Sequence, residues 1–413
     1  MEPLPRRDFL ARTAAAGTFA FLPPADLEAG SLRGQEPVRL GLIGAGRQGR
    51  AILGELGKLE TARVAAVCDV DPSRLRGARR RAPQAEALED WRRVLDLDLD
   101  AVVIATPTHL HREPAEAALQ AGLHVFCEAP LAHTAEDARA LARAARSSDR
   151  VFQTGLQGRS NPVYQLARSF ARSGALRDLV CLEARWNQKT SWRFGVGDPA
   201  RDRLLDWRLD PEVSLGLPGE VASHQVDTVS WFVDRLPLSV RGRGALRLHR
   251  DGREIPDTVT LEFLFPDGLV LLDQASLASS YERSFELFRG SNASIRLAST
   301  HGWMFKEADS ATQGWEVYAN RQRFHQDEGI TLIADATKLA RQGKLQEGVG
   351  LPNPPLFYAL RDFLASVAGG APVAAGAEEG LRAALMGIAA HEAVSGGSEI
   401  ALGPLFEGPR SGG

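Results

Sequence analysis

One segment of the chain combines the residue types that general acid–base chemistry requires. It runs from Gly219 to Phe232, and its apolar spacing predicts a helix on which Glu220, His224 and Asp227 form one polar stripe at positions i, i+4 and i+7. A histidine flanked by two carboxylates has its charged form stabilised and its tautomer held, which is how a general acid or base is arranged. The alternative is a solvated helix face with ordinary charge pairs. The residues just before the helix predict a pocket-lining loop: Gly216, Pro218 and Gly219.

A glycine-rich turn near the start of the chain has the form of a phosphate-binding loop. The apolar run Val38–Ile43 predicts a buried parallel strand, and it leads directly into GAGRQG at residues 44–49 and then into a predicted helix from Arg50. The glycines of such a turn permit a tight bend, close approach of the backbone to a pyrophosphate and close packing of helix on strand. The helix N-terminus adds unpaired N–H groups. The candidate cofactor-binding residues here are Gly44, Gly46, Arg47, Gln48 and Gly49.

An acidic residue stands where a dinucleotide-binding fold holds the adenosine ribose. The next predicted strand, Arg63–Cys68, ends at Asp69, 20 residues after Gly49. A carboxylate there accepts hydrogen bonds from the ribose hydroxyls and repels a 2′-phosphate, which favours NAD over NADP, although Arg74 nearby favours the opposite choice. Asp69 could instead cap a helix or a turn, a role that suits Asp71 better.

Strands alternate with helices as far as residue 155, which predicts a parallel, doubly wound Rossmann sheet. Strands are expected at Asp100–Ala105, His124–Cys127 and Val151–Gly155, with a helix at Glu113–Ala121. Ligands of such sheets lie at the carboxyl ends of the strands, so the rim segments 106–111 and 128–130 are expected to face the cofactor. His109 and His111 could ligate a metal, but no third ligand lies nearby in the sequence, and we expect none to bind.

Beyond residue 155 the hydrophobic period shifts toward two, which predicts an antiparallel sheet with one face free to wall a substrate pocket. The expected strands are Leu179–Arg185, Val240–Leu248, Val259–Phe265, Leu269–Ala275, Ser284–Arg289 and Ala293–Leu297. Helices are expected at Pro162–Ser173, Pro355–Ala368 and Ala377–Val394. We therefore predict an N-terminal arm at residues 1–36, a nucleotide-binding α/β domain at 37–155, and an α+β substrate and oligomerisation domain with C-terminal helices at 156–413.

Aromatic faces and amide donors suit a sugar ring, which presents both CH faces and hydroxyl groups. Three of the seven tryptophans fall close together with such donors, at Trp186, Trp192 and Trp207. The alternative is an aromatic packing cluster between domains, a role as plausible for Trp192. The candidate substrate-binding residues are Gln157, Arg159, Trp186, Asn187 and His224.

The composition excludes several classes of protein. Lys and Arg number 49 against 52 Asp and Glu, and the net charge of −3 gives no reason to expect nucleic acid or an anionic membrane as partner. Three cysteines are too few for a disulfide scaffold. The chain of 413 residues is long enough for two domains with separate cores.

The first residues predict an export signal. The motif RRDFL begins at Arg6, and a mostly small and apolar stretch continues to Leu22. The pattern resembles a twin-arginine signal and is shorter than the roughly 20 apolar residues that span a bilayer. We therefore expect a periplasmic protein without a membrane span; the alternative is an amphipathic or disordered arm on a cytoplasmic one.

Five segments, in their order and spacing, resemble the glucose–fructose oxidoreductase / inositol dehydrogenase / MocA (Gfo/Idh/MocA) family: GLIGAGRQGR, VCDVDP, AVVIATPTHLH, HVFCEAPLAHT and GEVASHQVDTVSWF. The resemblance runs from about Val38 to the C-terminus. It implies a Rossmann domain joined to an open-faced antiparallel sheet, and a homodimer or homotetramer formed through that sheet. It also implies NAD(P)-dependent oxidation of a secondary alcohol of a sugar or cyclitol.

The resemblance also implies roles for single residues. Gly44, Gly46 and Gly49 would hold the pyrophosphate, and Asp69 the adenosine ribose. His224 would be the catalytic histidine, with Asp227 as partner of the histidine or the substrate. The residues implied around the nicotinamide and its ribose are Thr106, Pro107, His111, Glu128, Trp207 and Arg208.

One position departs from the family pattern. The family's E-K-P motif stands here as Glu128-Ala129-Pro130, so the lysine that helps to remove the alcohol proton is missing. Either His224 moves the proton alone, or another group substitutes, or the net reaction is not ordinary dehydrogenation. The family's NAD-dependent glycosidases also lack this lysine. The alternative function is therefore a redox-neutral glycoside hydrolase or lyase, whose tightly bound NAD oxidises a ring hydroxyl transiently. A catalytically inactive NAD-binding sensor is a third possibility.

Overall fold

The computed structural model describes residues 36–407, except 313–315, 317–318, 325–326, 335–338 and 340–349. The predicted export signal therefore lies outside the described residues. By its contacts the chain from Pro37 onwards forms one unit. Within the described residues, no helix combines the length and the apolar character needed to cross a membrane.

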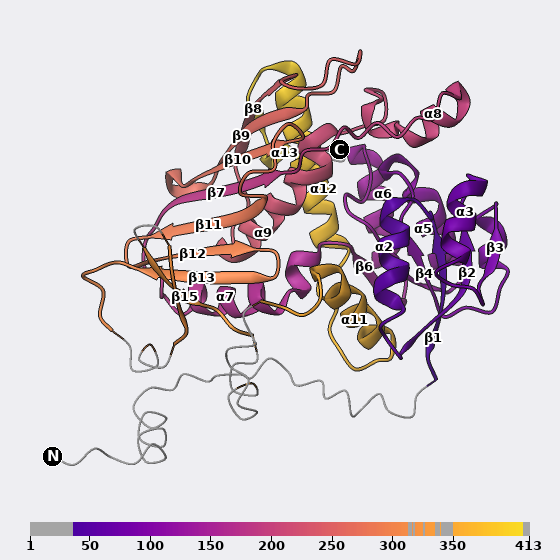
Figure 1. Cartoon of the computed structure of the whole chain (residues 1–413), viewed down its shortest axis with the longest axis horizontal. Coiled ribbons are helices and arrows are strands. Elements are labelled where there is room, and N and C mark those ends of the chain that lie inside the picture. Colours follow the sequence, from indigo (N-terminus) through magenta and orange to yellow (C-terminus); the bar gives the residue numbers. More distant parts are fainter. Residues whose placement is uncertain are drawn as a thin grey trace, which may run out of the picture. The chain divides into compact units, whose positions relative to one another are not determined.

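Six parallel strands form the first sheet, in the order β3-β2-β1-β4-β5-β6 (Figure 1). This is the strand order of a Rossmann sheet, which confirms the predicted fold class. Its strands are β1 (Val38–Ile43), β2 (Ala62–Cys68), β3 (Glu86–Leu88), β4 (Ala101–Ile104), β5 (His124–Cys127) and β6 (Phe152–Thr154). The sequence pattern did not predict β3, because three residues are too few to show a period.

Helices cover both faces of this sheet because alternate strand residues point to opposite sides. Val102 and Ile104 of β4 pack with α5 and α6, whereas Val103 packs with α2, α3 and α11. The helices are α2 (Arg47–Leu56), α3 (Pro72–Arg79), α4 (Arg92–Leu95), α5 (Arg112–Gln120), α6 (Ala135–Arg146) and α11 (Pro355–Val367). Helix α11 thus returns from the far end of the chain to the first sheet, where the rings of Phe126 and Phe363 lie 5.6 Å apart.

The second sheet has ten strands in the order β14-β15-β13-β12-β11-β7-β10-β9-β8-β16. Its strands are β7 (Leu179–Asn187), β8 (Ser239–Ala245), β9 (Thr258–Leu264), β10 (Val270–Ser276), β11 (Ser284–Gly290), β12 (Ala293–Ala298), β13 (His301–Lys306), β14 (Arg321–Arg323), β15 (Glu328–Thr331) and β16 (Ile400–Ala401). All pairs are antiparallel except β7 with β10, so the predicted antiparallel sheet is confirmed with one parallel pair. Helices α7 (Pro162–Arg172), α9 (Ser223–Val233) and α12 (Ala377–Gly396) pack on one face.

Strand β8 ends earlier than the predicted Leu248. The backbone N–H groups of Arg247, Leu248 and His249 each donate a hydrogen bond of 2.8 Å to the carboxylate of Asp257. A side chain that takes three consecutive amides offers this segment an alternative to the strand ladder. The pairing with β9 therefore stops at Ala245.

The loop before α9 does not line a pocket as predicted. It continues into a π-helical turn, Pro218–Ala222, that leads directly into α9. A Cβ on Gly219 would lie 2.1 Å from the Cβ of Leu215, and a Cβ on Gly387 of α12 would lie 3.1 Å from the Cα of Gly219. The glycine is thus required for helix packing, and the prediction of a pocket-lining loop was wrong.

Helix α12 contacts both sheets (Figure 1). At its N-terminal end, a Cβ on Gly380 would lie 2.3 Å from Oγ1 of Thr154 on β6. Further along, Gly387 faces the turn that precedes α9. We call α12 the bridging helix. Its two glycines touch the first sheet and the turn before α9 directly, so this one rigid helix sets how far α9 lies from the first sheet.

The packing of the glycine turn makes a prediction about stability. A Cβ on Gly49 would lie 1.9 Å from the carbonyl oxygen of Gly44, so Gly49→Ala should lower the free energy of unfolding by about 1–3 kcal/mol. Gly54→Ala is the matched control, since Gly54 lies on the same helix α2 with nothing within 4 Å of its Cβ position. That change should stabilise the protein by about 0.5–1 kcal/mol. Denaturant unfolding followed by circular dichroism measures both, and equal stabilities would contradict this packing.

Candidate active site

A crevice of about 1790 Å³ is lined by residues from both sheets. Gly44, Asp69 and Glu128 line it from the carboxyl edge of the first sheet, and His224 and Trp186 from the elements of the second. Small-molecule pockets usually measure roughly 300–1,000 Å³. The crevice therefore has room for a dinucleotide and a second ligand beside it.

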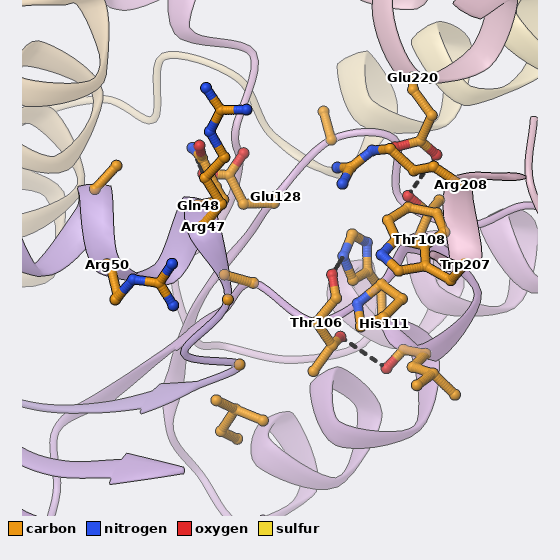
Figure 2. A pocket seen from close by; sticks show the side chains of 18 of the residues that line it. Arg47, Gln48, Arg50, Thr106, Thr108, His111, Glu128, Trp207, Arg208 and Glu220 are labelled. Carbon is orange, nitrogen blue, oxygen red and sulfur yellow. Dashed lines mark hydrogen bonds and ion pairs between the residues drawn. The ribbon is translucent and has the colours of Figure 1, made fainter. Parts of the chain in front are cut away.

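The glycine turn lies at one end of this crevice. Gly44 has a φ of +97°, and a Cβ there would lie 2.5 Å from the carbonyl group of Ala105. Gly46 is the N-cap of α2. Since a glycine has no side chain that could accept from the first N–H groups of the helix, these groups are left for a ligand. These are the properties that a pyrophosphate cradle needs. Arg47 and Gln48 also line the crevice, and Gln48 donates a hydrogen bond of 2.9 Å to Glu128 (Figure 2).

Asp69 ties the glycine turn to the end of β2. Its two carboxylate oxygens accept hydrogen bonds of 2.8 Å from the N–H groups of Ala45 and Asp71. Burial raises the pKa of Asp69, and these two hydrogen bonds oppose that effect. Asp71 caps α3 as expected, by accepting from the N–H groups of Ser73 and Arg74 at 2.9 Å. Asp69 itself lines the crevice, the position that ribose binding requires.

A segment that follows strand β7 reaches the nucleotide end of the crevice. We call it the strap, residues 193–205; it ends in α8 (Pro199–Leu205), and Phe194, Val196 and Leu204 line the crevice. Arg201 of α8 forms an ion pair with Asp71, and its guanidinium also donates to Ser73. The hydrogen bonds from Arg201 and Ser73 outweigh burial and lower the pKa of Asp71. The pattern of the sequence did not indicate this contact, which joins residues 130 positions apart.

His111 supports the rim of the crevice. Its Nδ1 lies 2.9 Å from the carbonyl oxygen of Pro130 and its Nε2 lies 3.0 Å from that of Thr106. Burial lowers the pKa of His111 to about 4, so the ring is neutral near pH 7 and carries one N–H for these two acceptors. Thr106, Pro107 and His111 all line the crevice, as expected of a nicotinamide side (Figure 2).

The polar stripe on the π-turn and α9 faces the crevice but does not form the predicted triad. Glu220 accepts a hydrogen bond of 2.8 Å from the hydroxyl of Thr108 and lies 3.4 Å from Arg208 (Figure 2). Asp227 accepts two hydrogen bonds from Arg159, at 2.9 and 2.7 Å. Arginines thus neutralise both carboxylates, because an unpaired buried charge is costly.

The carboxylates therefore do not raise the pKa of His224. Burial lowers the pKa of His224, opposed by a hydrogen bond with the backbone of Ala129. The expectation that the charged imidazole is stabilised by flanking carboxylates was wrong, because each carboxylate has an arginine partner. The imidazole is neutral near pH 7 and lines the crevice.

The predicted substrate-binding residues divide into two groups. Gln157 and Trp186 line the crevice, whereas Arg159 and Asn187 do not. The guanidinium of Arg159 donates hydrogen bonds to Asp227. The amide of Asn187 donates a hydrogen bond of 2.9 Å to the carbonyl oxygen of Tyr281. We therefore keep the prediction of direct substrate contact for Gln157 and Trp186, but not for Arg159 and Asn187.

The tryptophan cluster has a packing role. The guanidinium of Arg208 lies 4.4 Å from the ring centre of Trp207 and 5.7 Å from that of Trp192. Trp207 and His109 are 5.8 Å apart, edge to face. Trp192 and Trp207 are both buried and both line the crevice. Because their rings pack against the guanidinium of Arg208, they orient it toward Glu220. Within the described residues, no three His, Cys, Asp or Glu side chains form a group that could hold a metal ion.

Two lining residues carried no motif in the sequence. Tyr164 of α7 and Glu286 of β11 line the crevice and share a hydrogen bond of 2.7 Å. The only available signal was an acidic residue between Phe285 and Leu287 in a strand that is otherwise largely apolar.

Two family descriptions match the chain. Residues 38–156 match the oxidoreductase family with an NAD-binding Rossmann fold, and residues 164–302 match the GFO/IDH/MocA C-terminal domain. The chain belongs to the Gfo/Idh/MocA family. The resemblance seen in the five sequence segments is thereby confirmed, and so is an NAD-binding domain.

Several named relatives share part of the sequence. Levoglucosan dehydrogenase of Pseudarthrobacter phenanthrenivorans is 28% identical over 226 residues, which are 49% of this chain and 56% of that protein. Inositol 2-dehydrogenase of Acidothermus cellulolyticus is 30% identical over 267 residues, 63% of this chain and 73% of that protein. A glycosyl hydrolase family 109 protein of Shewanella amazonensis is 33% identical over 183 residues, 38% and 40% of the two chains. The match thus spans little more than half of the levoglucosan dehydrogenase.

Solved structures share the fold over nearly the whole chain. Levoglucosan dehydrogenase in complex with NADH and L-sorbose superimposes with a TM-score of 0.70 at 22% identity, covering 89% of this chain and 99% of that one. The residues of the present crevice fit NAD on their own geometry: a glycine turn in which a Cβ at Gly44 or Gly49 would clash, helix N–H groups without a side-chain cap, and a carboxylate at the ribose position.

The strap predicts slow release of the nucleotide. Arg201→Ala removes the ion pair with Asp71, so NADH dissociation should accelerate, by about tenfold. Arg203→Ala is the matched control, because Arg203 lies on the same helix, donates to the carbonyl oxygen of Pro199 and forms no ion pair within the described residues. Stopped-flow displacement of NADH fluorescence measures both rates. Equal rates in the two variants would show that the strap does not retain the nucleotide.

Proposed function

We propose that the chain is an NAD-dependent oxidoreductase acting on a secondary alcohol of a sugar, cyclitol or glycoside. The observation that carries the proposal is the single crevice in which the glycine turn and Asp69 of the nucleotide edge meet the imidazole of His224 and the ring of Trp186. The names of the levoglucosan and inositol dehydrogenases, which match about half or more of the chain, support this substrate class.

When bound, NAD supplies the hydride acceptor, and the chain has to orient the alcohol and remove its proton. We assign the proton to His224, because a neutral imidazole has a lone pair ready to accept it. Glu220 and Asp227 are held by Arg208 and Arg159, so we assign them to positioning of the helix face around His224. Asp69 is the group that favours NAD over NADP.

The second candidate is a redox-neutral glycoside hydrolase or lyase, and Ala129 favours it. At the position of the family lysine this methyl group packs against Leu156, Ala375 and Ala383, a cluster that includes the bridging helix. It holds no proton to exchange. A cycle in which the oxidised ring carbon is reduced again needs no outside oxidant, and relatives named as glycosyl hydrolase family 109 proteins match part of the chain.

Turnover experiments separate these functions. The purified protein is analysed for bound nucleotide by mass and incubated with a panel of polyols and 4-nitrophenyl glycosides, while NADH absorbance and nitrophenol release are recorded together. Net oxidation predicts NADH formation; redox-neutral cleavage predicts nitrophenol without accumulating NADH. Bound NAD with neither product would contradict both functions and support the sensor.

His224→Ala should lower either activity by at least about 10²-fold, because it removes the proposed proton acceptor. His301→Ala, which changes a histidine of β13 outside the crevice, is the control and should leave activity intact. In the wild type, activity should stay constant around neutral pH and fall only at a pH below the ordinary histidine pKa, because burial lowers the pKa of His224 and a protonated imidazole cannot accept the proton. Undiminished turnover by His224→Ala would refute the assignment.

We further propose that the protein is exported and assembles into a homo-oligomer. The RRDFL motif supports export, and the exposed Leu272, on the face of β10 opposite to the buried Leu271 and Asp273, supports association through the open face of the sheet. Changing Arg6 and Arg7 together to Lys should abolish periplasmic delivery in cell fractionation, whereas unchanged delivery would contradict the proposed export signal.

The proposed homo-oligomer is tested by light scattering, which should give a mass of at least twice 44.7 kDa. A monomer would contradict the assembly.

A further inference from the structure

Two buried carboxyl groups lie side by side on the helix-covered face of the second sheet. Asp273 of β10 and Glu286 of β11 are both in register with Ala184 of the intervening strand β7. Their exposed fractions are 1% and 5%. Neighbouring strands are about 4.8 Å apart, and the small methyl of Ala184 leaves space above it, so the two acids can lean toward each other.

Only one of the two acids reaches the crevice. Glu286 lines it, together with Tyr164 and Ser299, whereas Asp273 does not. The Tyr164 hydroxyl donates 2.7 Å to Oε2 of Glu286 and accepts a hydrogen bond of 3.3 Å from the N–H of Ser299. The backbone amide therefore fixes the direction of the phenol, and the phenol holds Glu286 as an acceptor at the crevice wall.

The crevice wall beside Glu286 contains a further acceptor without a donor. Oε1 of Gln225, a residue that lines the crevice, is buried without a partner in the described part of the chain. The amide nitrogen of Gln225 donates a hydrogen bond of 2.9 Å to the carbonyl oxygen of Arg185, and the Gln225 side chain also forms a hydrogen bond with Glu286. No arginine or lysine among the described residues forms an ion pair with Glu286 or Asp273, unlike Glu220 and Asp227. A ligand with hydrogen-bond donors would pair with these acceptors, whereas the carboxylate of Glu286 would repel an anionic ligand.

We propose that Glu286, held in place by Tyr164, binds hydroxyl groups of the substrate and restricts the crevice to neutral, hydroxyl-rich rings. This rests on the proposed function and narrows its substrate class: sugar acids and sugar phosphates are disfavoured. Burial raises the pKa of Glu286 to about 7 and that of Asp273 to about 8. The charged form of Glu286 accepts from a hydroxyl more strongly, so affinity for the polyol should rise as the pH increases through 7.

The test measures binding rather than turnover. Isothermal titration of the NADH-loaded protein uses myo-inositol and levoglucosan as neutral probes, with glucuronate and glucose 6-phosphate as anionic counterparts. Glu286→Gln and Tyr164→Phe should each weaken binding of the neutral probes about tenfold and leave NADH affinity unchanged. Glu286→Gln should also remove the pH dependence near 7. Asp273→Asn is the matched control, since it changes a buried acid on the same face that does not line the crevice, and it should bind the probes like the wild type.

Several outcomes of the binding experiment would overturn the inference. If Glu286→Gln binds the neutral probes as the wild type does, or Asp273→Asn loses as much affinity, Glu286 has only a structural role. Tyr164→Phe keeps the test valid if Glu286→Gln fails to fold. Wild-type protein that binds no neutral probe at 100 mM, or binds glucuronate equally well, refutes the substrate class. Glu286-dependent binding without NADH formation instead refutes the oxidoreductase function and leaves this inference standing.

Discussion

The contacts of the bridging helix α12 at two glycines are the constraint on which the site depends. Gly380 lies against Thr154 of the first sheet, and Gly387 lies against Gly219 at the turn before α9. Because a Cβ at either helix position would meet neighbouring atoms, the distance between the two contact surfaces follows from the rise of one rigid helix. His224 is thereby held against the edge of the sheet that binds the dinucleotide, and the crevice is an outcome of packing rather than of a flexible linker.

Charge within the crevice is arranged so that its proposed proton acceptor stays neutral. Two acidic side chains flank His224 along the chain, yet each is paired with an arginine: Glu220 with Arg208 and Asp227 with Arg159. Burial raises the pKa of both carboxyl groups, and the arginine beside each one opposes that effect. Burial then acts on the imidazole without a compensating carboxylate and lowers its pKa. An uncharged base beside a dinucleotide is suited to accepting a proton from an alcohol.

The wall at Glu286 differs from the rest of the crevice in having no cation. The nucleotide end contains arginines, which suit phosphates, whereas the sheet end contains a carboxyl group held by Tyr164. This separation of charge along one crevice gives the dinucleotide and the proposed neutral polyol opposite ends to occupy. The methyl group of Ala129 packs against a cluster that includes Ala383 of the bridging helix, so the position of the family lysine is here a packed one with no proton to exchange.

Local patterns alone determined the Rossmann sheet, the glycine turn and the acidic residue at position 69, because strand periodicity and backbone approach depend on neighbours in sequence. The same reasoning placed His224 on a helix that faces the crevice. It could not find the partners of Glu220 and Asp227, nor the ion pair of Arg201 with Asp71 across 130 positions, since those side chains meet only after distant elements pack. Nor could it find the crevice wall at Glu286. The neighbours of a carboxylate inside a strand are known only once the adjoining strands are paired and the helices packed on them. Tertiary structure decided which charges are neutralised and which remain available to a ligand.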